Sequence, residues 1–295
     1  MQPLSQNAGM VWMVKPALFF SNPETVASNS FQKSNASNLH EQAMLEFDRM
    51  VDTLIYNKIH IIISENEDEK APDAIFPNNW ISFHHDKSII KYPMMAENRR
   101  RERNIDLPFF PDRVVDFSSF ENEGMFLEGT GSIVFDHVHR KAYASESART
   151  DFSLLSMVCE ELGYTPVRFA AVDKNGLAIY HTNVIMHIGY GYVVIALDAI
   201  PSLEDRDFLV NSFAEDGLEI ILISMEQMES FAGNMLQLIN AEGERITVCS
   251  MTAFDSLSID QVELLQSHSS LLPIDVSAIE LLGGGSVRCM IAEIF

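Results

Sequence analysis

The chain has 295 residues, and 42 acidic against 20 basic side chains give it a formal net charge of −22. That charge opposes binding to nucleic acid or to an anionic membrane through a general basic surface. A hydrophobic fraction of 47% with 21% charged residues excludes a disordered chain. The longest apolar runs are too short to span a bilayer. Three widely spaced cysteines and no secretory leader pattern predict a cytoplasmic protein without disulfides.

One phrase recurs along the chain at intervals of about 52 residues. Each copy has a polar stub, an apolar strand, a turn and a second apolar strand. An amphipathic segment and a short closing strand follow. The copies align on Asn79, Gly131, Asn183, Asn234 and Ser286.

The repeated unit is therefore ββαβ. In chain order, the spacing of apolar residues predicts helices at residues 41–57, 94–104, 151–162, 203–214 and 259–268. The predicted closing strands lie at residues 60–63, 113–115, 166–168 and 218–222. One such unit cannot bury its apolar face alone, so the units must pack on each other.

These patterns predict an α/β fold in which five pseudo-symmetric ββαβ units form a propeller around a central active-site pocket. We expect a single domain over residues 1–295. The last unit is short, because the chain ends at residue 295. Strands at residues 11–14 and 18–20 are expected to complete its blade and close the ring.

Equivalent positions in a ring of repeats lie at similar distances from its axis, so the stubs should converge on one pocket. Three different repeats bring Cys289, His181 and Glu128 there, a set typical of nucleophilic catalysis. A cysteine thiolate is a strong nucleophile near neutral pH. A histidine can move protons to and from the reacting groups, and an acidic group can orient it. The stubs also supply Asn78, Asn79, Asn183 and Asn234.

Other candidates have simpler interpretations. Cys159 and Cys249 are expected to be small buried hydrophobes. The histidines at two predicted hairpin turns lack further ligands at zinc-site spacing, so we expect them at the surface; they are His84, His85, His137 and His139. A basic cluster is either a solvated helix face or a site for a local anionic group; it comprises Arg99, Arg100, Arg101 and Arg103.

On these residues the chain resembles the guanidino-group modifying superfamily, or penteins. That superfamily includes arginine deiminase, dimethylarginine dimethylaminohydrolase and the amidinotransferases. The resemblance is most specific at residues 127–129, 145–150, 181–183 and 283–285. It implies that Glu128, His181 and Cys289 are catalytic, without a metal or an organic cofactor. It also implies that Arg149, with Arg99 or Arg100, binds a substrate α-carboxylate through paired hydrogen bonds.

Two asparagines depart from the arginine-processing members. Asn79 and Asn183 stand where those members carry aspartates understood to hold the cationic guanidinium. An amide offers a donor and an acceptor, which suits a neutral ureido group. With the phrases at residues 78–80 and 231–236, the chain looks most like the citrulline-utilisation hydrolases. We therefore predict cleavage of citrulline, a small amino acid, to ornithine, CO2 and ammonia through a covalent cysteine adduct.

Two alternative functions are compatible with the same residues. The nearest is an arginine deiminase, dimethylarginine hydrolase or amidinotransferase acting on a guanidino substrate. A non-catalytic binding propeller is a further alternative, since one branch of the pentein fold binds ribosomal subunits. The acidity of the chain and the complete Cys-His-Glu set disfavour it. The sequence leaves open whether a homo-oligomer forms, and whether Asn22 lies at the pocket rim or in a plain turn.

Overall fold

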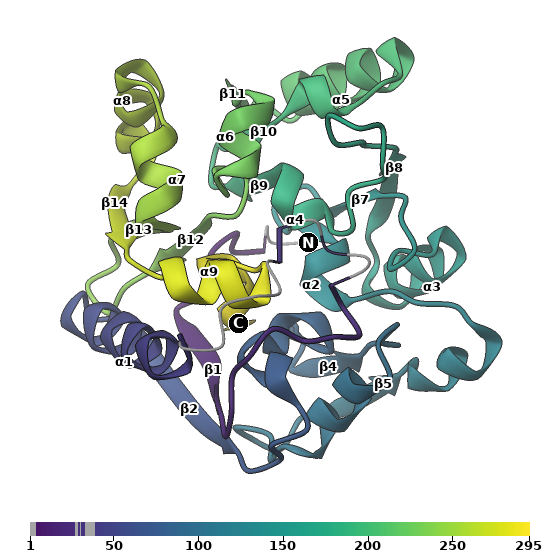
Figure 1. The fold of residues 1–295 in the computed structure, drawn as a ribbon. Helices are drawn as coiled ribbons and strands as arrows, with labels where there is room; N and C mark the ends of the chain where they lie inside the picture. Colours follow the sequence, from purple (N-terminus) through teal and green to yellow (C-terminus); the bar gives the residue numbers. More distant parts are fainter. Residues whose placement is uncertain (1–3, 27–28, 30, 33–38) are drawn as a thin grey trace.

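The computed structural model describes residues 4–26, 29, 31–32 and 39–295. Five three-stranded sheets surround a common axis, and helices lie between and outside them (Figure 1). The strands of the first two sheets in the chain are β3 (Ile81–Phe83), β4 (Ser88–Lys91), β5 (Arg113–Asp116), β6 (Val134–Asp136), β7 (Lys141–Ser145) and β8 (Thr165–Phe169). The next two sheets contain β9 (Met186–Gly189), β10 (Tyr192–Ile195), β11 (Glu219–Leu222), β12 (Leu236–Ile239), β13 (Arg245–Ser250) and β14 (Ser270–Ile274). The fifth contains β15 (Ala292–Ile294), β1 (Met10–Pro16) and β2 (His60–Asn66).

The connections follow the predicted ββαβ order. In each sheet the central strand pairs antiparallel with one neighbour and parallel with the other, as β4 does with β3 and β5. A parallel pair needs a crossover connection, which the helical segment of each unit provides. The α-helices are α1 (His40–Tyr56), α2 (Gly129–Ser132), α3 (Phe152–Leu162), α4 (Thr182–Ile185), α5 (Leu203–Glu215), α6 (Met225–Glu229), α7 (Met251–Ser256), α8 (Ile259–His268) and α9 (Ser277–Gly283). The 3₁₀ helices are η1 (Pro72–Ile75), η2 (Pro77–Asn79), η3 (Asn98–Asn104), η4 (Ser118–Glu123), η5 (Leu197–Ala199) and η6 (Val287–Met290). Within the described residues, no helix is both long and apolar enough to cross a bilayer.

The fifth sheet joins the two ends of the described chain. Strand β1 pairs antiparallel with β15 and parallel with β2, so the ring closes as predicted. The prediction of a strand at residues 18–20 was wrong. Strand β15 takes that place in the sheet. Strand β1 ends at Pro16, because proline has no N–H to donate to the neighbouring strand. Phe19 instead packs edge-on against Phe76, with ring centroids 6.1 Å apart.

Four of the five predicted helices are α-helices, and the segment at 94–104 is a 3₁₀ helix beginning at Asn98. Side chains three residues apart eclipse in a 3₁₀ helix. Arg99 and Glu102 therefore share one face and form an ion pair, whereas Arg100 and Arg103 share another and both contact Glu121. The arginine cluster is thus divided between faces, instead of forming one basic surface.

Each of the two hairpin turns that carry histidines has one buried histidine. His84 and His137 are buried, which contradicts the sequence-based expectation. Their ring nitrogens bond to Ser82 Oγ and Tyr164 Oη, each at 2.7 Å. The turns are covered because Phe295, next to β15, packs its ring on His137 at a centroid distance of 4.5 Å.

The polar stubs of the repeats meet at the centre of the ring. Four of them form the short helices η2, α2, α4 and η6 at the start of the strands. Helix α2 contacts both η2 and α4, and η2 contacts η6. Large apolar clusters fill the space between the sheets and the outer helices. Polar side chains on the stubs therefore face one another inside an apolar shell.

Candidate active site

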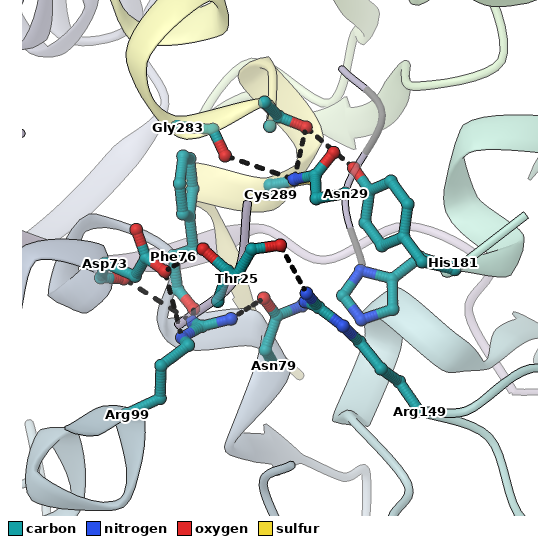
Figure 2. A pocket seen from close by; sticks show the side chains of 13 residues that line it. Thr25, Asn29, Asp73, Phe76, Asn79, Arg99, Arg149, His181, Gly283 and Cys289 are labelled. Atoms are coloured by element: carbon teal, nitrogen blue, oxygen red, sulfur yellow. Dashed lines mark hydrogen bonds and ion pairs between the residues drawn. The ribbon is translucent and has the colours of Figure 1, made fainter. Parts of the chain in front are cut away.

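A pocket lies at the centre of the ring, and Figure 2 shows the side chains around it. Five of the ten predicted site residues line it: Asn79, Arg99, Arg149, His181 and Cys289. Three more predicted residues stand behind these and bond to them: Glu128, Asn183 and Asn234. The remaining two, Asn78 and Arg100, do not line the pocket.

Cys289 lies in η6, directly after the glycine turn at residues 283–285, and is 4% exposed. The side-chain amides of Asn183 and Asn234 approach its Sγ with their nitrogens at 3.7 and 3.4 Å. Burial raises the pKa of this thiol, an effect that these amides partly offset. The free site therefore holds a protonated thiol near neutral pH, with donors placed to stabilise a thiolate. Cys159 and Cys249 are buried in the apolar core, as predicted.

His181 bonds to Glu128, with 2.8 Å between Nε2 and Oε2. Burial alone would raise the pKa of Glu128, but the charge of Arg149 and the contact with His181 hold it well below its usual range. An ionised carboxylate only accepts hydrogen bonds, so Nε2 carries the proton and Nδ1 keeps a lone pair. Burial lowers the pKa of His181 to about 4, so the imidazole is neutral at pH 7. This tautomer suits a general base.

Arg149 adjoins this pair from the strand-to-helix connection after β7. Its Nη1 lies 3.3 Å from Glu128 Oε2, and its Nη2 donates to the carbonyl oxygen of Thr25 at 3.5 Å. The guanidinium also lies over the ring of Tyr180, 5.2 Å from its centroid. The arginine is 2% exposed and borders the pocket. It therefore places a positive charge on the pocket wall next to the histidine.

Arg99 contacts three side chains, and its Nε lies 3.7 Å from Asp73 Oδ2. Its Nε and Nη2 donate to the two carboxylate oxygens of Glu102 at 2.7 and 3.0 Å. Its Nη1 donates to Asn79 Oδ1 at 2.8 Å (Figure 2). A guanidinium has no acceptor, so it fixes which side of the Asn79 amide faces it. The oxygen of Asn79 points to Arg99, and Nδ2 remains buried without a partner among the described residues.

The glycine at 131 makes this arrangement possible. A Cβ added to Gly131 would lie 2.5 Å from Asn79 Nδ2 and 2.8 Å from His181 Nδ1. Both distances are far below van der Waals contact, so any larger residue would displace the amide or the imidazole. Residue 131 aligns with asparagines in three of the other repeats. At this position in the second unit there is no room for a side chain larger than that of glycine.

Sequence reasoning missed two acids of the site, Glu102 and Asp73. Glu102 could have been found from its position three residues after Arg99, because residues three apart share a face in either kind of helix. Asp73 lines the pocket and accepts a hydrogen bond from Asn22 Nδ2 at 2.8 Å. Burial raises the pKa of Asp73, opposed by the charge of Arg99. Its Oδ1 has no partner among the described residues.

The other predicted residues have separate roles in the structure. Asn78 Nδ2 donates to Thr130 Oγ1 at 3.3 Å and joins two of the stubs. Arg100 turns away from the pocket, and its Nε donates to the carbonyl oxygen of Met94 at 3.1 Å. Asn22 is buried and does not itself line the pocket. Its backbone oxygen accepts the N–H of Thr25 in a turn, and its side chain donates to Asp73, which does line the pocket.

One group of side chains in the described ranges has the spacing of a metal site. Ligand atoms of Asp136, His139 and Asp216 lie within 4.8 Å of one another. His139 already donates to Asp136, and the Lys141 ammonium lies 2.6 Å from Asp216. A cation would have to displace that lysine. None of these residues lines the central pocket.

Comparisons with solved structures show that the chain shares a known fold. The N-terminal domain of ArgZ, described as an arginine dihydrolase from the ornithine-ammonia cycle in cyanobacteria and solved with substrate, matches with a TM-score of 0.73. Sequence identity is 14%, and the match covers 97% of both chains. A dimethylarginine dimethylaminohydrolase in an adduct with S-methyl-L-thiocitrulline matches with a TM-score of 0.65 at 18% identity, over 97% of this chain and 100% of the other.

A third similar structure is AgrE in a ternary complex with ornithine and NAD+, with a TM-score of 0.73 and 14% identity. The match covers 97% of this chain but 39% of AgrE, and 40% of full-length ArgZ. The chain thus spans about two fifths of these longer proteins. No curated protein sequence matches the chain.

The ring of five three-stranded sheets is thus a fold that the chain shares with these solved structures. The family model described as N,N dimethylarginine dimethylhydrolase, eukaryotic, matches residues 15–295. The chain belongs to that family.

Proposed function

We propose that the chain hydrolyses citrulline to ornithine, CO2 and ammonia, with Cys289 as the nucleophile. The observation that carries the proposal is the orientation of Asn79. Because Arg99 occupies its oxygen, Asn79 offers the pocket only an N–H donor. A ureido group has a carbonyl oxygen that accepts such a bond, whereas a guanidinium has only N–H donors. If an N–H of a guanidinium faced the N–H of Asn79, both donors would remain unpaired in a buried site, at a cost of about 1–3 kcal/mol.

The groups next to the nucleophile support a neutral substrate as well. Cys289 Sγ is approached by the amides of Asn183 and Asn234, which carry no charge. The carboxylate of Glu128 is already engaged by Arg149 and His181. A guanidinium could therefore pair with Glu128 only by displacing Arg149 or His181, and an unpaired buried cation is costly.

His181 takes part in each stage of the proposed reaction at Cys289. His181 accepts the proton of the Cys289 thiol at Nδ1, and Sγ forms a bond to the ureido carbon. The carbonyl electron pair moves to oxygen, where Asn79 Nδ2 donates a hydrogen bond to the developing charge. When that pair returns, the first C–N bond breaks and the imidazolium protonates the departing nitrogen. Water, activated by the same imidazole, then adds to the carbon of the adduct, and the C–S bond breaks to restore the thiol. The carbamic acid that is released loses CO2, which breaks the second C–N bond and frees the second nitrogen as an amine or ammonia.

The distal end of the substrate is assigned to the pocket's charged groups. Arg149 would pair with the α-carboxylate, and the unpartnered Oδ1 of Asp73 would accept from the α-ammonium. Arg99 is already saturated by Glu102 and Asn79, so its role is to hold the amide in place.

Hydrolysis of a guanidino substrate is the second candidate, and one observation favours it. Asp73 presents an unpartnered carboxylate oxygen to the pocket, which could pair with a guanidinium instead of an α-ammonium. The similar proteins ArgZ and dimethylarginine dimethylaminohydrolase are named for reactions on arginine and dimethylarginine. The two candidates differ in which pocket end holds the reacting carbon.

Trapping of the covalent intermediate tests the proposed role of Cys289. The protein is mixed with citrulline, quenched in acid and digested, and the peptide with Cys289 is examined by mass spectrometry. We expect an adduct on Cys289 whose mass depends on citrulline, and none in the Cys289→Ser variant. Ornithine production by Cys289→Ser at the wild-type rate would contradict the proposal.

A further inference from the structure

A second cavity of about 530 Å³ lies outside the central pocket. Helices α6, α7 and α9 each contribute to its lining, as does the segment just before Tyr180. Its apolar wall comprises Phe31, Ile179, Met228, Phe231 and Leu281. We propose that this cavity binds a small organic cation, an ammonium group carried on an aliphatic body. The inference is independent of the proposed reaction.

A buried carboxylate without a counter-ion carries the proposal. Glu280 lines the cavity and is 5% exposed. Its two oxygens accept hydrogen bonds from Ser286 Oγ at 2.6 Å and Thr252 Oγ1 at 2.7 Å. No basic side chain among the described residues pairs with it. Two neutral hydroxyls satisfy the hydrogen bonds but leave the charge uncompensated, which is unfavourable at a buried position.

The other charges of the cavity are already used. The Lys174 ammonium pairs with Glu229 at 3.0 Å. The carboxylate of Asp173 accepts the backbone N–H groups of Asn175 and Leu177, each at 2.9 Å, and so closes a turn. Asp173 is only half-buried, so water screens its charge, whereas Glu280 is buried without a counter-ion among the described residues. The negative charge of Glu280 therefore selects a cation. A single available carboxylate is too few for Ca²⁺ or Mg²⁺, whereas the apolar wall suits an aliphatic chain.

The cavity adjoins the central pocket without being part of it. The Phe31 ring packs between Phe231 in the cavity wall and Tyr180 in the pocket wall, at centroid distances of 5.2 and 6.1 Å. Glu280 also accepts the N–H of Gly284 at its backbone oxygen, at 2.8 Å. A ligand in the cavity thus touches residues that pack on the catalytic pocket, although the two sites share no lining residue.

The test uses n-hexylammonium as a probe, titrated calorimetrically in the presence of excess ornithine, which occupies the central pocket if it binds there. We expect one probe per chain and at least tenfold weaker binding to the Glu280→Gln variant, which keeps both hydroxyl bonds. Asp173→Asn is the matched control, because it removes one carboxylate of the same cavity and should bind like the wild type. The neutral analogue n-hexanol should bind at least tenfold more weakly than the probe.

A second variant tests the site in case Glu280→Gln fails to fold. Leu281→Lys places an ammonium of the chain itself at the cavity wall, so it should exclude the probe. The proposal is overturned if the wild type does not bind n-hexylammonium or if n-hexanol binds as tightly. It is also overturned if Glu280→Gln, or Leu281→Lys where the first variant is unfolded, binds the probe like the wild type. None of these outcomes depends on citrulline being the substrate.

Discussion

Replacement of Asn79 by aspartate tests the selection of a ureido group most sharply. In the variant, Arg99 Nη1 would keep one carboxylate oxygen where it now holds Oδ1 at 2.8 Å. The second oxygen would take the place of the Nδ2 donor and face the substrate carbonyl. Loss of one oxyanion donor costs about 2.7–4 kcal/mol, or about 10²–10³ in kcat. Repulsion between the two oxygens adds to that loss, so we expect citrulline turnover to fall by at least about 100-fold.

The assay is ornithine release from citrulline under saturating substrate, with thermal unfolding measured in parallel. Asn79→Ala should lose a similar factor without adding charge, because it also removes the donor. Asn211→Asp, at an exposed position of α5, is the control for an added negative charge and should leave turnover unchanged. Arginine should inhibit Asn79→Asp more strongly than the wild type, since the new carboxylate can accept from a guanidinium. Citrulline turnover within about threefold of wild type for a folded Asn79→Asp would refute the reasoning, which predicts the loss of an oxyanion donor.

Two further predictions follow from the site and the core. Gly131→Ala should reduce turnover by about 10²-fold, because the added methyl group displaces Asn79 or His181. Gly9→Ala is the control and should be neutral, since the nearest atom to its added Cβ is 3.6 Å away. Equal activities of the two variants would contradict this prediction. The buried imidazoles should lower stability in acid, because burial lowers the pKa of His181 to about 4 and of His187 to about 3. Between those values and about 6.5 the unfolded chain binds more protons at each histidine, so each contributes a loss of up to about 1.4 kcal/mol per pH unit as the pH falls. Burial raises the pKa of Glu102 to about 7 and so acts in the opposite sense. The test therefore isolates one histidine: between pH 7.5 and 5 the denaturant midpoint of His187→Phe should fall less than that of the wild type, and an equal fall would contradict this.

The repeat was the feature that the sequence displayed most clearly. Because the stubs recur about every 52 residues, the ββαβ order, the closed ring and the central position of Cys289 could be predicted without coordinates. The sequence did not reveal which side chains of neighbouring units contact one another. Whether Arg99 or Arg100 faces the pocket depends on the 3₁₀ geometry of η3, and a helical pattern of 3.6 residues per turn does not distinguish them.

Local sequence patterns also could not predict which polar side chains are buried. The hairpin turn at His137 looked exposed, and it is buried because the far end of the chain packs on it through Phe295. Asp73 lies in no repeated stub, and it enters the site only because η1 packs against η3. In each case the deciding contact joins residues far apart in the sequence.

The central claim is that citrulline is the substrate and Cys289 the nucleophile. Its most direct test is product analysis after incubation of the purified protein with citrulline, arginine, dimethylarginine or agmatine, each alongside Cys289→Ala. The account predicts ornithine and ammonia from citrulline alone, and no product from the variant. Release of citrulline from arginine or dimethylarginine, with citrulline itself left intact, would contradict it.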